Sequence, residues 1–125
     1  MLRKINWILL LGILLLSACS SPSNSSDIDN KLYKDGEKLA QAFYEEAENS
    51  SVIDMNDSLD DQMNKFRAKY DQTDDKWSAE EKQFIFDVNM VFIDYTDYSL
   101  YRESDKLEDF YDNIEKLKTE YGMEI

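Results

Sequence analysis

Apolar residues recur at intervals of three and four along most of this chain, which is the period of an α-helix. One glycine, Gly36, and no proline fall between residues 31 and 121. A sheet of several strands would need more turn-forming residues than this segment contains. We therefore expect an all-α fold, a small three- or four-helix bundle.

The first helix is expected over residues 29–48, with Gly36 on its apolar face. The missing side chain there lets another helix approach closely. Glycine also costs about 1 kcal/mol of helix propensity, so a break near Asp35 and Gly36 is the alternative. A turn at residues 49–51 precedes the second helix, where Ser51 and Asp54 resemble a weak capping arrangement. The apolar positions of this second helix are Val52, Met55, Leu59, Met63, Phe66 and Tyr70.

The third helix is expected over residues 79–101, opened by a capping box of Ser78 and Glu81. It is the most apolar of the set, so we expect it to lie between the other helices. Its polar residues are expected to form one narrow face in contact with solvent. These residues are Gln83, Asp87, Asp94 and Asp97.

The last helix is expected to start with Ser104 or Asp105 as its cap and to end near Tyr121. Gly122 follows at the position where helices commonly end in a left-handed turn. The alternative is a single long helix in place of the last two, which would give three helices instead of four.

The first nineteen residues have a different pattern. Arg3 and Lys4 precede an apolar run at residues 8–16 that is too short for a membrane-spanning helix, which needs roughly 20 residues. The run leads into Leu16, Ser17, Ala18 and Cys19. The segment resembles the signal peptide of bacterial lipoproteins, and these four residues match the lipobox. The resemblance implies that the Cys19 sulfur carries a diacylglycerol group and that the leader is cut after Ala18.

Three regions follow from this resemblance and from composition. Residues 1–18 are a lipoprotein signal peptide that is removed. Residues 19–30 are the lipidated cysteine and a tether rich in serine, asparagine and aspartate, which cannot bury enough apolar area to order itself. Residues 31–125 are an acidic helical domain. The implied location is the extracytoplasmic face of the cell membrane, or the outer membrane in an organism with two membranes, which Ser20 would favour.

The charge balance restricts the partners of this domain. The chain has 14 basic and 27 acidic residues. Without the leader, which holds Arg3 and Lys4 and no acid, 12 basic and 27 acidic residues remain. This balance argues against binding nucleic acid, because phosphate backbones need a basic surface. It permits a cationic partner, although acidity can also serve solubility alone.

The residue types also argue against catalysis. The chain has no histidine, three glycines and one cysteine, Cys19, which the lipobox assigns to lipid. The usual general base, a thiol nucleophile, a thiolate zinc site and a glycine-rich phosphate loop are therefore missing. The acidic runs at residues 54–60 and 71–75 lack the glycine and the glutamate that an EF-hand calcium loop requires. We expect no enzyme activity, no metal and no cofactor.

Tyrosine is in surplus near the junction of the last two expected helices, at Tyr95, Tyr98, Tyr101 and Tyr111. These residues either belong to the core or form an aromatic, acidic surface that grips a cationic amphipathic peptide. The second reading predicts a membrane-anchored binding module. By leader, size and charge it would be similar to immunity or superinfection-exclusion lipoproteins. The alternative is a structural or accessory lipoprotein that docks on an envelope complex through Met90, Ile93 and Leu100.

Overall fold

A computed structural model describes residues 27–125, and this part of the chain is all-α. The predictions for the signal peptide, for Ala18 and Cys19 and for most of the tether lie outside the described residues. The helices are α2 (Asn30–Asn49), α3 (Asp57–Lys69), α4 (Ala79–Tyr101) and α5 (Ser104–Tyr121). The predicted helical bundle is confirmed. The last two helices are separate, so the described part has four helices and not three.

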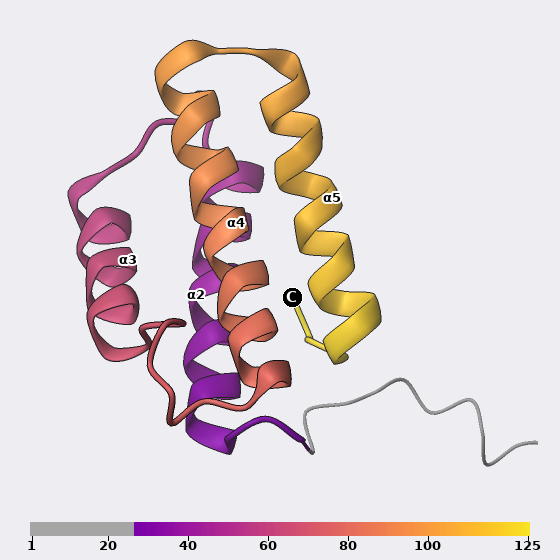
Figure 1. Ribbon diagram of the computed structural model, residues 1–125. Helices are drawn as coiled ribbons and strands as arrows, with labels where there is room; N and C mark the ends of the chain where they lie inside the picture. Colours follow the sequence, from indigo (N-terminus) through magenta and orange to yellow (C-terminus); the bar gives the residue numbers. More distant parts are fainter. Residues whose placement is uncertain (1–26) are drawn as a thin grey trace, which may run out of the picture.

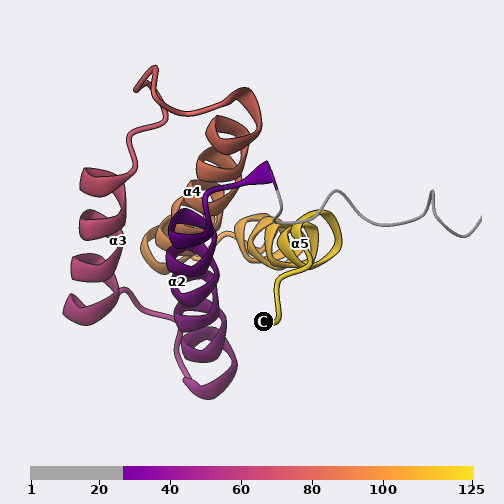
Figure 2. The ribbon, with the colours of Figure 1, turned by 90° about the horizontal axis from the view of Figure 1, so that it is seen from below.

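The helices run up and down in succession (Figure 1). Seen from below, α2 and α4 occupy the centre, with α3 and α5 on opposite sides of them (Figure 2). Helix α4 packs against α5 and α2, and α2 also packs against α3. Helix α4 therefore lies between neighbours, as its apolar composition predicted, while the side facing away from α2 stays open.

A group of aromatic rings connects three of the helices within the core. The ring of Phe43 on α2 lies 5.0 Å from that of Phe92 and 4.9 Å from that of Tyr95, both on α4. Tyr95 in turn lies 5.5 Å from the ring of Phe110 on α5. All four rings are essentially removed from solvent. They join three helices through contacts of the kind that aromatic pairs prefer.

A hydrogen bond connects the N-terminal end of α2 to the N-terminal end of α4. The Asp29 carboxylate accepts the backbone N–H groups of Lys31 and Leu32, and the predicted capping box of Ser78 and Glu81 is present. The Glu81 carboxylate also accepts the Asp29 N–H at 3.0 Å. Packed structure thus begins inside the segment predicted as tether, because Ile28 is buried as well.

Gly36 lies on the buried face of an unbroken α2, so the alternative of a break at this residue is wrong. A β-carbon at this position would lie 2.8 Å from Cζ of Phe84 and 3.2 Å from Cγ2 of Val88. The predicted close approach of a second helix is confirmed, and that helix is α4.

The second predicted helix starts too early. Helix α3 begins at Asp57, capped by the Asn56 side chain, which accepts the Leu59 N–H at 2.9 Å. Ser51 and Asp54 do not cap it. Residues 50–56 are a loop, and Val52 within it is exposed. The prediction was wrong because the apolar spacing of three and four continues through this loop although no helix forms there.

The cap predicted for the last helix is also wrong, since Glu103 holds the capping position and makes no side-chain cap bond. The end of that helix is as predicted. Gly122 has φ 67° and ψ 26°, the left-handed conformation, and its N–H bonds back to the Lys118 carbonyl at 3.1 Å.

The predicted solvent face of α4 is partly wrong, because Asp87 and Asp94 are only 2% and 3% exposed. Helix α5 covers both. Asp87 accepts bonds from Lys116 Nζ at 2.8 Å, from the Tyr121 hydroxyl at 2.6 Å and from the Gln83 amide at 3.0 Å. The α4–α5 interface therefore contains a polar seam.

Asp94 has a single partner in this seam, the Asn113 amide, at 2.6 Å. Burial raises the pKa of Asp94 above its usual range. A carboxyl whose pKa is raised by folding lowers stability at neutral pH, where it is ionised. That cost disappears as the pH falls through the folded-state pKa.

Replacing Asp94 by asparagine is therefore expected to raise the free energy of unfolding at pH 7 by about 1 kcal/mol, since it removes a buried charge without removing the acceptor. The gain should shrink as the pH is lowered towards about 4, where the native carboxyl becomes neutral. Urea unfolding of the native protein and of Asp94→Asn between these pH values measures the difference in the free energy of unfolding. Asp97→Asn, one turn further along the helix, controls for the change in net charge. A loss of stability at pH 7 would contradict the expectation.

Candidate binding surface

The net negative charge is concentrated at one end of the bundle, because few basic residues lie there. We define the acidic end as residues 42–63 and 91–112, which form the upper half of Figure 1, and the N-terminal end as residues 27–41, 64–90 and 113–125. The acidic end holds 14 acidic and 2 basic residues, whereas the N-terminal end holds 13 and 10. Most of the net negative charge of this domain is therefore carried by the half that lies away from residue 27.

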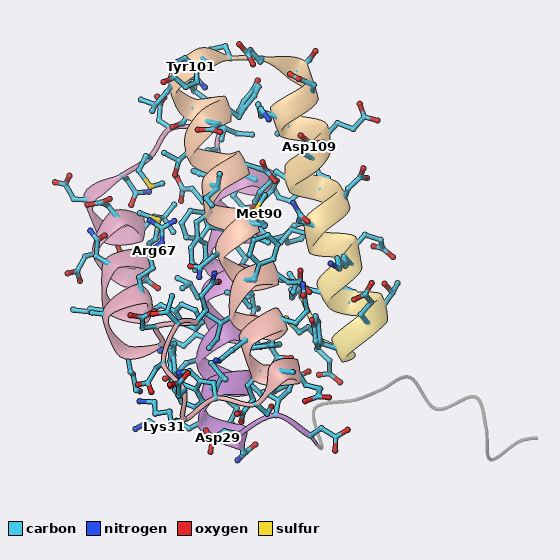
Figure 3. All side chains as sticks on the ribbon, viewed as in Figure 1. Asp29, Lys31, Arg67, Met90, Tyr101 and Asp109 are labelled. Carbon is cyan, nitrogen blue, oxygen red and sulfur yellow. The ribbon has the colours of Figure 1, made fainter. Side chains whose placement is uncertain are left out.

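The same end carries the most exposed large apolar side chains of the described residues. Leu100 and Tyr101, in the last turn of α4, are 65% and 67% exposed, and Val52, in the loop before α3, is 56% exposed. Figure 3 shows Tyr101 at the top of the bundle. Apolar side chains within an acidic surface are typical of a site for a partner that is both cationic and amphipathic.

The four predicted tyrosines have different roles. Tyr95 is a core residue whose hydroxyl donates to the Asp54 carbonyl at 3.2 Å, and burial raises its pKa to about 12. Tyr111 is half-buried and donates to Glu48 at 2.8 Å, and burial together with this bond raises its pKa to about 12. Tyr101 is exposed, and Tyr98 is half-buried. The tyrosines thus share one end of the bundle without forming one continuous surface.

Arg102 was not singled out from the sequence, yet it connects the end of α4 to the loop before α3. Its guanidinium donates to the Ile53 carbonyl and to the Asp54 carboxylate, and it lies 5.7 Å from the centre of the Tyr98 ring. Asp54 is 48 residues away along the chain, so no local pattern connects the two.

The open side of α4 carries the other apolar surface predicted from the sequence. Phe86, Met90 and Ile93 line a hollow of about 300 Å³ between α3 and α4, with Arg67 on the opposite wall. Figure 3 shows Met90 and Arg67 on the side facing the viewer. Leu100, predicted as part of the same patch, lies two turns beyond Ile93, in the last turn of α4.

A second hollow, of about 260 Å³, lies between α2 and α3. Its apolar part is formed by Leu39, Phe66 and Tyr70, and Lys69 at its edge is held by Asp35 at 2.7 Å. Lys38 and Lys65 also line this hollow, and Lys65 pairs with Asp61 on α3. The hollow therefore lacks the acidic lining that a cationic partner would need.

Among residues 27–125, no group of three or more carboxylate or thiol side chains is placed to hold a metal ion. None of the helices described for this part of the chain has the length and apolar character needed to cross a membrane.

No family model, no curated protein and no solved structure matches this chain. Its functional assignment therefore depends on the chemistry of its own surface.

Proposed function

We propose that this protein is a lipid-anchored extracytoplasmic binding module that captures a cationic amphipathic peptide at its acidic end. One observation carries the proposal: the half of the bundle with 14 acidic and 2 basic residues also presents Leu100, Tyr101 and Val52 to solvent. The anchor on Cys19 rests on the lipobox. The proposal includes no catalysis, because the chain lacks histidine and its one cysteine is assigned to lipid.

Charge and apolar area contribute differently to such binding. Long-range attraction between unlike charges speeds the encounter and is screened beyond about 8 Å at physiological salt. Apolar contact then contributes about 25 cal/mol for each Å² removed from water. A lysine or arginine of the peptide can also lie over the exposed Tyr101 ring. A peptide with both features therefore binds better than one that is only charged.

The arrangement of the two ends suits an anchored interceptor. Residue 27 enters the bundle at the end opposite the acidic end (Figure 1). The chain from Cys19 to Asp27 has seven residues in between and can reach at most roughly 30 Å. A lipid on Cys19 would then keep the less acidic half towards the membrane, where anionic lipids repel negative charge, and the acidic end outward.

Survival of cells against a panel of cationic membrane-active peptides tests the proposal. Cells that express the full chain should be protected, whereas Cys19→Ala should remove the anchor and the protection. A Leu100→Ser and Tyr101→Ser double variant should lose protection while the protein is still anchored. The matched control is Phe86→Ser with Met90→Ser, which removes as many apolar side chains from the open side of α4, outside the acidic end, and should leave protection unchanged. Equal survival with and without the chain across the panel would refute capture.

A second candidate is a structural or accessory lipoprotein that docks on an envelope complex. The exposure of Phe86 (45%) and Ile93 (39%) beside the half-buried Met90 favours it, because these apolar side chains follow helical spacing along one side of α4. The same variants separate the two candidates. Docking would be supported if the variant on the open side of α4 loses an envelope function and the Leu100 and Tyr101 variant does not.

A further inference from the structure

We propose that Tyr98, Asp54 and the Ile53 carbonyl form a guanidinium-binding site, which Arg102 fills in the free protein and which an arginine of the captured peptide takes over. This inference rests on the proposed capture of a cationic peptide and specifies the side chain that the site selects.

The geometry of the site matches a guanidinium group. One terminal nitrogen of Arg102 donates to the Ile53 carbonyl and the other donates to the Asp54 carboxylate. The central carbon lies 5.7 Å from the centre of the Tyr98 ring. Two acceptors at the edge of the group and an aromatic ring beside it are the features that distinguish arginine from lysine, whose ammonium is a compact point charge.

The contact is open to exchange. The side chains of Arg102 and Asp54 are 42% and 63% exposed, so an incoming cation can reach the site from solvent. Ion pairs at such positions are weak, because water competes for both partners. Asp87 and Lys116 differ in this respect, because the Asp87 carboxylate is buried under α5.

The backbone of Arg102 also favours release of its side chain. Arg102 has φ 57° and ψ 26°, and it is the only non-glycine residue with positive φ among residues 27–125. This left-handed conformation closes the last turn of α4, a position where glycine is the usual residue. This conformation is unfavourable for arginine, and the contacts of the guanidinium help to hold the backbone in it. The backbone can therefore relax when the side chain leaves the site.

The surroundings of the site suit an amphipathic peptide. Arg102 directly follows the exposed Leu100 and Tyr101, and Ile53 directly follows the exposed Val52. The guanidinium site therefore lies among the exposed apolar side chains of the acidic end. An arginine with apolar neighbours in the peptide can contact both at once.

Arg102→Gly tests this assignment, because glycine accepts the backbone conformation and empties the site. The full chain, purified in a nonionic detergent, is titrated with N-acetyl-arginine amide by calorimetry. If Arg102 fills the site nine-tenths of the time, the variant should bind about tenfold more tightly than the native protein. N-acetyl-lysine amide should show no such gain. Adding Asp54→Asn or Tyr98→Leu to Arg102→Gly should abolish it.

Several results would overturn the assignment. If Arg102→Gly binds the arginine amide no more tightly than the native protein does, Arg102 makes only a structural contact. If N-acetyl-lysine amide shows an equal gain in affinity, the site does not select a guanidinium. Circular dichroism checks that the variant is folded. If it is not, Arg102→Lys is the second variant, since it keeps the charge but cannot make both bonds, and it should bind the arginine amide more tightly than the native protein does.

The outcomes separate this inference from the proposed function. Arginine selectivity in the calorimeter without protection of cells would leave the site standing and reject peptide capture. Equal protection against a peptide and against its arginine-to-lysine counterpart, with no gain for Arg102→Gly, would keep capture and reject the guanidinium site.

Discussion

Replacing Lys116 by methionine is expected to lower the free energy of unfolding by about 3 kcal/mol, because it leaves a buried carboxylate without its cation. Lys116 Nζ lies 2.8 Å from Asp87, which is 2% exposed. Methionine keeps most of the apolar length of the lysine, so little packing is lost. The Tyr121 hydroxyl and the Gln83 amide remain as donors to Asp87, but neither carries charge. Urea unfolding at pH 7 measures the loss.

The matched control is Lys65→Met. Lys65 Nζ lies 2.7 Å from the Asp61 carboxylate, almost the same separation, but both side chains are mostly exposed on α3. Such surface pairs contribute about 1 kcal/mol or less. Equal losses from the two substitutions would mean that α5 does not shield Asp87 from water. Adding Asp87→Asn to Lys116→Met should restore part of the stability, since it removes the unpaired charge.

The sequence predicted those features whose cause is local. The capping box of Ser78 and Glu81 and the left-handed end at Gly122 depend on residues that lie within a few positions of each other. Helices α2, α4 and α5 accordingly end where the pattern predicted, within a residue or two. The start of α3 was wrong for a reason that is also local, since the Asn56 cap outweighs an apolar period that continues through Val52 and Met55.

The polar seam was not predicted, because its cause lies between two helices. Asp87 and Asp94 are seven residues apart on the polar side of α4, which is typical of a solvent-exposed face. Their partners Asn113 and Lys116 are three residues apart on α5, where they also read as ordinary surface residues. Only the packing of α5 against α4 turns the two polar stripes into one buried network.

The sequence predicted a candidate surface near the junction of α4 and α5, but not the contribution of residues 42–63 to it. Net charge and the tyrosine surplus can be counted in the sequence, whereas the charge difference between the two ends cannot. The acidic end joins two segments, 42–63 and 91–112, that are separated by 27 residues with nearly balanced charge. The up-and-down topology places these segments side by side, and it also brings Asp54 to Arg102.

Replacing Gly36 by leucine is also expected to destabilise the fold by about 3 kcal/mol, since overpacking a tight core forces side chains or helices apart. The first carbon of any side chain here would lie 2.8 Å from Cζ of Phe84. That ring is fully buried, with the Tyr33 ring 5.9 Å and the Tyr121 ring 5.0 Å away, so it has no free space to move into.

The melting temperature measures this effect, at about 4–8 °C for each kcal/mol in a domain of this size. Gln41→Leu, at an exposed position of the same helix, is the control and should leave the melting temperature nearly unchanged. Gly36→Ala gains about 1 kcal/mol of helix propensity and still introduces the clashing carbon, so it should lie between leucine and the native protein. An alanine variant more stable than the native protein would show that α2 and α4 can separate without cost. The two helices would then approach closely at Gly36 only because glycine is there, and the stability of the fold would not depend on that close approach.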